Sequence, residues 1–416
     1  MNFFVRTCVF PLALTPALFC QTRLTLADAV SQAMASNPQL AVVAARVGVT
    51  EGLRRQAGLS PNPRLIVQLE NTRFWESPPF SYAQDTSTYA FVAQTFETAG
   101  KRDRRVELAT ENVRSSQLEV QLQRRQIASR VSTAYWIAAG AGRVRDLLQA
   151  ETANFEQMVQ FNRDRVREGA APEVDLLRIE VERDRLASSA RTAAQEAEWT
   201  RIALFREMGK IEFPPVEFAD PLEQMHPVAS LTLNQILEQR VEMTLAREAV
   251  EQARADLRLQ QANARVDPDL HFGYERFGGF DTLYAAAQIP LPIRNRNQGQ
   301  IEAAAAGIKA AESSVAATEA AIRSEVASAA SNYESLQKLL NETLRPMRDG
   351  ADQVYRIVDA AYRHSVVAFR NVWNAERTRP MRSCSTAPGM RISGRIWRTI
   401  FCSAGNRNCR QPVFSV

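Results

Sequence analysis

Histidine and cysteine are the side chains that most often bind metals or attack substrates, and this sequence holds few of either. The three histidines are His226, His271 and His364, and none of them stands at metal-ligand spacing from another. His271 lies in an alternating segment, so we expect it to be part of a strand wall. The sequence therefore predicts no metal site.

Motifs for catalysis are also missing from the sequence. It contains no glycine-rich phosphate loop and no Gly-x-Ser-x-Gly nucleophile turn. No other grouping of candidate acids, bases and nucleophiles stands out. We therefore expect a protein that is not an enzyme and needs no cofactor.

The basic charge of the chain is confined to its C-terminal end. The sequence pI is about 9.1 and the formal net charge is +5. Residues 377–416 contain eight arginines and no acidic residue, so the rest of the chain is mildly acidic. Because no basic segment is interleaved with aromatic residues, we expect no nucleic-acid partner.

The first 20 residues have the pattern of an export signal. Arg6 precedes an apolar run from Val9 to Leu18, which is too short to span a bilayer, and polar chain follows from Gln21. Cys20 leaves lipidation open, although Phe19 stands where a small residue normally precedes a lipidated cysteine. The alternative to an export signal is that residues 1–20 form a first buried segment of the fold.

The body of the chain has no cysteine between residues 21 and 383. Small exported domains often depend on disulfides for stability. This body cannot form any, so its fold must depend on packing. The five cysteines all lie near the two ends, as Cys8, Cys20, Cys384, Cys402 and Cys409.

Two halves of the chain repeat one pattern. The phrase LTLADAVSQAM (24–34) returns as LTLNQILEQRV (231–241), and an apolar column at seven-residue spacing returns at a fixed offset of 195. The column is Val106, Val113, Val120, Ile127 and Ala134, and its counterpart is Ile301, Ile308, Val315, Ile322 and Ala329. The chain therefore reads as a tandem duplication.

Each half has the same order of elements. A helix comes first, then two alternating strands, then a very long helix. In the first half these segments are 25–58, 64–73, 88–98 and 102–166; in the second they are 232–264, 269–277, 282–291 and 299–363. In the first half, a turn at 167–175 leads into a further helix ending near Met208. Residues 363–371 are the counterpart of this turn in the second half. We place the repeats at 21–220 and 221–379.

The lengths of these elements define the fold class. About 65 helical residues extend roughly 100 Å, and a sustained heptad column indicates helices packed side by side. Strands of about ten residues match a tilted bilayer crossing, but four strands cannot close a membrane barrel. We therefore predict an α+β protein in which three copies supply twelve strands to one β-barrel above a long α-helical barrel.

Two short segments carry a resemblance to a known family. PLPIRNRNQGQI (290–301) and TFETAGKRDRR (95–105) look like the strand-to-helix passages of the heavy-metal branch of the TolC family of outer-membrane efflux channels. The resemblance covers residues 24 to about 379. Proline stops strand pairing and glycine permits a sharp turn, so we predict hinges at Gly100, Pro290, Pro292 and Gly299.

The resemblance implies a partner set and a location. Such a channel is a homotrimer in the outer membrane that extends into the periplasm. It docks on a periplasmic adaptor and an inner-membrane pump, and it conducts what the pump expels. The resemblance to the heavy-metal branch implies heavy-metal cations as the cargo. The lipid of the outer membrane would surround its strands.

The family's adaptor contacts lie at the two helical tips, and its pore gate lies near the second tip. The matching tip positions are Arg167, Gly169, Asp175, Leu176, Arg363 and Ser365, and the matching gate positions are Asn371 and Asn374. The family usually has carboxylates at the gate and glycine at position 365. An uncharged ring would bind cations more weakly at the constriction.

Two alternatives to an intact channel remain open on the sequence. A periplasmic adaptor or scaffold also uses long helical hairpins, although it has one hairpin and not two blocks that each follow a strand pair. The helical pattern also stops near residue 377, and 380–416 forms an aberrant basic tail. The tail is either genuine or the mark of a frameshifted, nonfunctional gene product.

Overall fold

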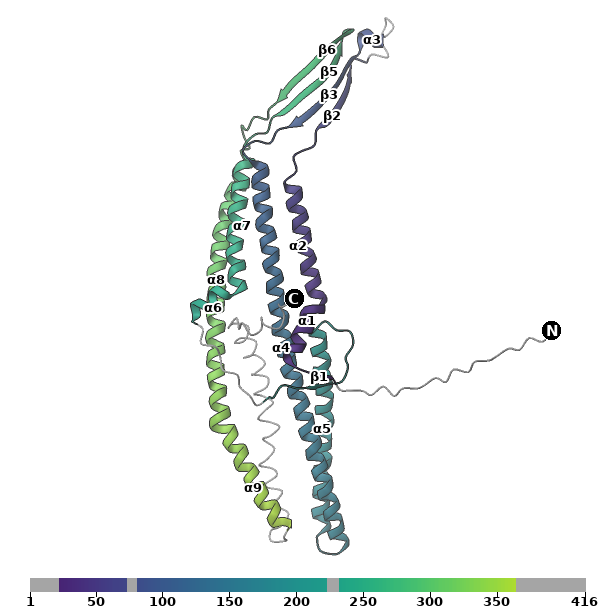
Figure 1. The fold of residues 1–416 in the computed structure, drawn as a ribbon, viewed down its shortest axis with the longest axis vertical. Coiled ribbons are helices and arrows are strands. Elements are labelled where there is room, and N and C mark those ends of the chain that lie inside the picture. The colour runs from purple at the N-terminus through teal and green to yellow at the C-terminus, as the bar shows by residue number, and fades with distance from the viewer. Residues whose placement is uncertain (1–21, 73–80, 223–231, 364–416) are drawn as a thin grey trace, which may run out of the picture.

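A four-stranded sheet stands at one end of a long stack of helices in the computed structural model (Figure 1). The structure describes residues 22–72, 81–222 and 232–363. The signal peptide predicted over 1–20 and the tail predicted over 380–416 lie outside these ranges.

The helices and strands follow the predicted order in both halves. The first half contains β1 (Thr22–Leu24), α1 (Leu26–Ser36), α2 (Pro38–Ala57), β2 (Arg64–Glu70), α3 (Tyr82–Asp85), β3 (Ser87–Thr95), α4 (Lys101–Arg167), α5 (Glu173–Glu207) and β4 (Val216–Phe218). The second half contains α6 (Leu233–Gln239), α7 (Val241–Asn263), β5 (Asp269–Phe277), β6 (Phe280–Gln288), α8 (Gln298–Lys338), the π-helical turn η1 (Leu339–Leu344) and α9 (Arg345–Arg363).

The first helix of each half is broken, so the prediction of one continuous helix was wrong in both places. In the first half the break falls at Asn37, whose side chain accepts a 2.9 Å hydrogen bond from the Gln39 amide while Pro38 opens α2. In the second half it falls at Arg240, which is 4% exposed and pairs with Glu325 of α8 at 3.1 Å.

The longest helices agree with their predicted spans. Helix α4 has 67 residues, which corresponds to about 100 Å. Its counterpart runs through α8, η1 and α9 without a loop, and Figure 1 shows it bending where these elements meet. A π-helical turn inserts an extra residue into the backbone hydrogen-bond ladder, which accounts for the bend.

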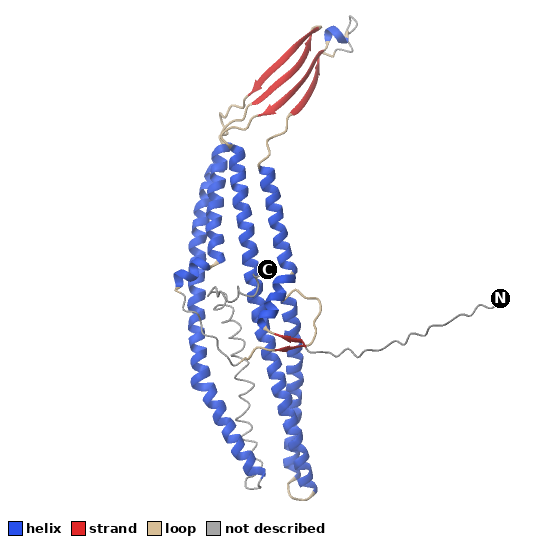
Figure 2. Cartoon of the chain, in the orientation of Figure 1, coloured by secondary structure: helices blue, strands red, loops and turns tan. Residues whose placement is uncertain are grey.

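The upper helices form one layer in the order α2, α4, α7, α8, since each packs on the next. Helix α5 returns along the lower half of α4 and forms a hairpin with it (Figure 2). In the part of the chain that the structure describes, α2 and α8 are therefore the two free edges of the layer.

The main core lies at mid-height and includes a small sheet that the sequence did not predict. Strands β1 and β4 pair in parallel, with Leu24 opposite Phe218. Tyr135 of α4 is fully buried beneath them and donates a 3.0 Å hydrogen bond to the Leu24 carbonyl. Burial raises the pKa of Tyr135 far above its ordinary value, so the hydroxyl stays protonated and ties α4 to the sheet.

The upper sheet joins the two repeats. Its order is β2-β3-β5-β6 and every pair is antiparallel. The two-residue turn between β5 and β6 is Gly278–Gly279, with φ values of +56° and +83°, as a tight hairpin requires. The predicted start of this strand was residue 282. Because the turn is so short, β6 begins two residues earlier, at Phe280.

The interface between α4 and α7 contains two neighbouring carboxylates, Glu111 and Glu248, with Arg114 paired to Glu111 at 2.7 Å. Burial, together with the hydrogen bond and charge of Glu111, raises the pKa of Glu248 from 4.5 to about 7. The folded state therefore holds a proton that the unfolded state releases at lower pH.

We expect stability to fall as the pH rises from about 4.5 to about 7, because folding must then retain that proton at increasing cost. Melting temperatures measured across this range should decline for the native chain. The decline should become shallower in Glu248→Gln and stay in the control Glu334→Gln, at an exposed position on α8. An unchanged profile in Glu248→Gln would refute the assignment.

Candidate functional site: sheet faces, strand-to-helix junctions and tip

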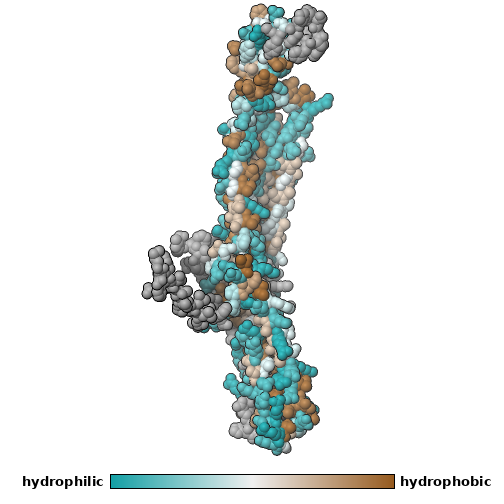
Figure 3. Space-filling view, turned by 90° about the vertical axis from the view of Figure 1, so that its right-hand side faces the viewer, coloured by the Kyte–Doolittle hydropathy of each residue, from teal (hydrophilic) through white to brown (hydrophobic). Residues whose placement is uncertain are grey.

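The register of the upper sheet divides its side chains into two faces. One face, here the apolar face, consists mainly of exposed hydrophobic side chains; Leu65 is 73% and Leu283 is 78% exposed. Its larger members are Leu65, Val67, Leu69, Val92, Leu270, Phe272, Tyr274 and Leu283. Figure 3 shows apolar side chains gathered at this end of the molecule. Such a surface is unstable in water, so it requires a covering.

The opposite face, here the polar face, carries charged and aromatic groups. Its charged residues are three carboxylates and one guanidinium: Glu70, Asp269, Glu275 and Arg64. An aromatic cluster lies between them, in which the Phe91 ring is 4.7 Å from Tyr284 and 5.2 Å from His271, measured between centroids. His271 is thus a strand residue stacked on Phe91, and this face is acidic overall.

The aromatic cluster depends on Gly273. A Cβ atom there would lie 2.3 Å from both the Ala90 carbonyl oxygen and the Phe91 Cα. Glycine therefore allows β3 and β5 to approach closely under the Phe91 ring.

The first strand-to-helix junction is held by a buried ion pair between the repeats. Lys101 at the start of α4 lies 2.6 Å from the Asp267 carboxylate, and its side chain is 9% exposed. Lys101 also donates to the Arg265 carbonyl, and the Thr98 amide donates to Asp267 at 2.8 Å. Gly100 precedes Lys101 with φ +66°, the left-handed conformation that glycine favours.

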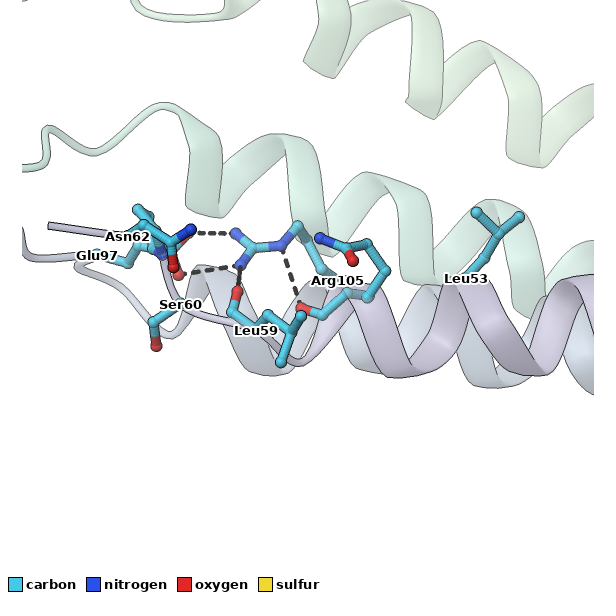
Figure 4. A pocket seen from close by; sticks show the side chains of 9 residues that line it. Leu53, Leu59, Ser60, Asn62, Glu97 and Arg105 are labelled. Carbon is cyan, nitrogen blue, oxygen red and sulfur yellow. Dashed lines mark hydrogen bonds and ion pairs between the residues drawn. The ribbon is translucent and has the colours of Figure 1, made fainter. Parts of the chain in front are cut away.

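A groove opens beside this junction, between the end of α2 and the start of β2. Arg105 spans its wall: it donates to Glu97 at 2.9 Å and to the carbonyls of Ala57 and Leu59 at 3.4 Å (Figure 4). The hydrogen bond from Arg105 lowers the pKa of Glu97, so this pair stays charged at neutral pH.

The second junction differs from the prediction at one residue. Pro290 and Pro292 lie directly after the end of β6, where strand pairing stops. Gly299, however, lies inside the first turn of α8, and the residue with positive φ is Asn297, at +60°. Asparagine tolerates this conformation, and its side chain is fixed by donating to the Gln260 carbonyl at 2.8 Å. The turn is thus made by Asn297.

The first helical tip is the loop between α4 and α5. Gly169 has φ +72° and its amide donates to the Val166 carbonyl, a glycine cap that ends α4. Arg167 is 77% exposed and Asp175 36% exposed by side chain. Leu176 instead packs on the buried cluster of Phe155, Val159 and Ile179, so it stabilises the hairpin.

The second tip follows helix α9, whose last residue is Arg363. Ser365 and the gate positions Asn371 and Asn374 lie outside the described residues.

The described residues contain neither a cluster of metal ligands nor a helix that could span a membrane. Over the ranges that the structure covers, no three His, Cys, Asp or Glu side chains form a group that could hold a metal ion. No helix within those ranges is long and apolar enough to cross a membrane.

Known proteins resemble this chain both in sequence and in fold. Residues 29–205 match the Outer membrane efflux protein family. The fold is similar to that of CusC (TM-score 0.76, 17% identity, 93% of each chain) and of the Campylobacter jejuni CmeC outer membrane channel (TM-score 0.76, 14% identity, 91% of this chain and 85% of that one). By sequence and by fold the chain is similar to proteins of the outer-membrane efflux class, which confirms the predicted family resemblance and the α+β fold.

One relative in sequence is named for metal resistance. The chain is 26% identical over 368 residues to the cobalt-zinc-cadmium resistance protein CzcC of Cupriavidus metallidurans, covering 85% of this chain and 84% of the relative. The resemblance to a heavy-metal protein that the two junction segments show therefore extends over most of the chain.

Proposed function

We propose that the chain is the outer-membrane channel of a tripartite efflux pump and works as a homotrimer. The observation that carries this is the division of the sheet into an apolar and a polar face. Strands of seven to nine residues with one apolar face suit a barrel wall that meets lipid outside and water inside. Each copy offers four strands, so three copies supply twelve.

The helices then form the periplasmic part of the duct. Because α4 extends about 100 Å from the sheet to its tip, its tip can reach a partner deep in the periplasm. We propose that Arg167, Gly169 and Asp175 contact the adaptor, with Arg167 and Asp175 making the polar contacts. Gly169 sets the shape of the loop.

We further propose divalent metal cations as cargo. The relative named for cobalt, zinc and cadmium resistance supports this. The polar face of the sheet also supports metal cations as cargo. It carries more carboxylates than guanidinium groups, and acidic walls favour cations. A duct needs no tight binding site, since tightly bound cargo would not leave.

Native mass spectrometry and single-channel recording test this function together. The chain of 46.5 kDa should give a complex of three copies in detergent, and that complex should conduct ions in a planar bilayer. A monomer without conductance would overturn the proposal. Growth of a deletion strain on cobalt, zinc or cadmium, with and without the restored gene, tests the cargo separately.

A further inference from the structure

Both outer strands of the upper sheet have a free edge. The sheet order places β2 and β6 at opposite sides, and no other described strand pairs with their outer edges. A free apolar edge is a template for another strand, and a lipid-exposed edge leaves backbone groups without partners. In a ring of copies, β6 of one copy meets β2 of the next.

This pairing brings two further segments together. Strand β2 begins at the helical end of the sheet, and β6 ends there (Figure 2). The chain before β2 in one copy, residues 58–63, therefore lies beside the chain after β6 in the next, residues 289–297. Within one copy the two segments stand at opposite edges and cannot meet.

The segment after β6 presents three apolar side chains. Ile289, Leu291 and Ile293 are 55%, 75% and 74% exposed, and Pro290 and Pro292 stand between them. The Ile293 amide donates to the Leu291 carbonyl at 2.9 Å, which closes a tight turn around Pro292. The prolines restrict this segment, so little conformational entropy is lost when it docks.

The segment before β2 borders the groove beside Arg105. Apolar groups line it at Leu53 and Leu59, which are 60% and 59% exposed, and Pro61 lies between the helix end and the strand. Arg105 fixes the backbone of Ala57 and Leu59 through their carbonyls (Figure 4). The groove is thus shaped in advance and lies at the height of the exposed segment.

The helices below have matching edges. On α2 the exposed apolar residues recur at heptad-like spacing and are bulky; on α8 the exposed residues at such spacing are small. The α2 set is Val42, Val49 and Leu53, and the α8 set is Ala303, Ala306, Ala310, Ser313 and Ala317. Bulky side chains on one edge fit between small ones on the other, as in close helix packing.

We propose that residues 289–293 of one copy occupy the groove formed by Leu53, Leu59, Pro61 and Arg105 of the next copy. This contact closes the ring at the level where strands become helices. It rests on the proposed trimer and deepens it by naming the surfaces that join.

Disulfide trapping tests the contact in the full-length chain. All five native cysteines are first changed to serine, and Leu59→Cys is then combined with Leu291→Cys. Oxidation should give two-chain and three-chain bands on non-reducing gels, because a disulfide forms only between neighbouring Cβ atoms. Each single variant should lack the three-chain band. Leu59→Cys with Ile211→Cys, at a 91% exposed site near mid-height, is the matched control and should give neither band.

Native mass spectrometry of the same variants separates the two proposals. A trimer that gives no bands with the Leu59 and Leu291 pair, or gives as many bands with Ile211→Cys, overturns the docking contact and leaves the channel intact. Failure of the parent chain to form a trimer overturns the proposed function itself. As a second measure, Leu291→Asp should lower the temperature at which the trimer dissociates, and Ile211→Asp should leave it unchanged.

Discussion

Replacing Gly273 with alanine should destabilise the upper sheet by about 3 kcal/mol or more. The added Cβ would stand 2.3 Å from the Ala90 carbonyl oxygen and from the Phe91 Cα. Both are backbone atoms, so relief requires β3 and β5 to move apart, and a rotamer change cannot provide it. The Phe91 ring would also lose its place beside Tyr284 and His271.

Thermal melting in detergent measures this loss, together with the fraction of trimer in native mass spectrometry. Gly307→Ala is the matched control, since nothing lies within 4 Å of a Cβ there and the residue is in α8. Alanine is the better helix former, so this control should gain up to about 1 kcal/mol. If Gly273→Ala melts and assembles like the native chain, the close approach of β3 and β5 does not exist as described.

Periodic features of this protein were predictable from its sequence because a repeating pattern reports local geometry directly. The helical pattern predicted the span of α4 to within a residue at each end, and alternation located all four strands of the upper sheet. Duplication made each assignment stronger, since the same pattern had to be read twice. The two faces follow from alternation as well.

Features that depend on distant residues were not predictable. The break at Asn37 has a local signal in the Asn-Pro pair, but the break at Arg240 has none and involves Glu325 on another helix. The choice of Asn297 over Gly299 depends on where α8 begins, and the Gln260 carbonyl fixes that asparagine. Strands β1 and β4 are three residues each, too short for a periodic pattern.

In the candidate site, too, residues with a local signal were predictable and residues that depend on distant partners were not. Pro290 and Pro292 mark the end of β6 because proline has no amide to donate, and Gly100 marks the left-handed turn before α4. Leu176 was grouped with the adaptor contacts, whereas its side chain packs within the hairpin. The partner of Lys101 was not predicted either, since Asp267 is 166 residues away and belongs to the other repeat.

That ion pair leads to the second large effect. Lys101→Met should destabilise the protein by about 3–5 kcal/mol at neutral pH, because it leaves the Asp267 carboxylate partly buried without its cation. The Arg265 carbonyl loses its donor as well. Because the pair joins the first repeat to the second, the loss should also loosen the junction between strands and helices.

The pH dependence separates a lost ion pair from lost packing. Burial acts to raise the pKa of Asp267, but the hydrogen bonds from Lys101 and Thr98 outweigh it, and the pKa lies below its ordinary value of 3.8. The pair therefore stabilises the folded state above that value, and the contribution is lost as the pH falls through the folded pKa. The difference between the native chain and Lys101→Met should accordingly be full at pH 7 and shrink in acid.

A double-mutant cycle with Asp267→Asn completes the argument. Lys101→Met combined with Asp267→Asn removes both charges, so it should cost less than the sum of the two single changes. Arg254→Met with Glu251→Gln, an exposed pair on α7, is the control and should show a coupling of about 0.5 kcal/mol or less. Additive effects at Lys101 and Asp267 would mean that packing, and not the ion pair between the repeats, holds the junction together.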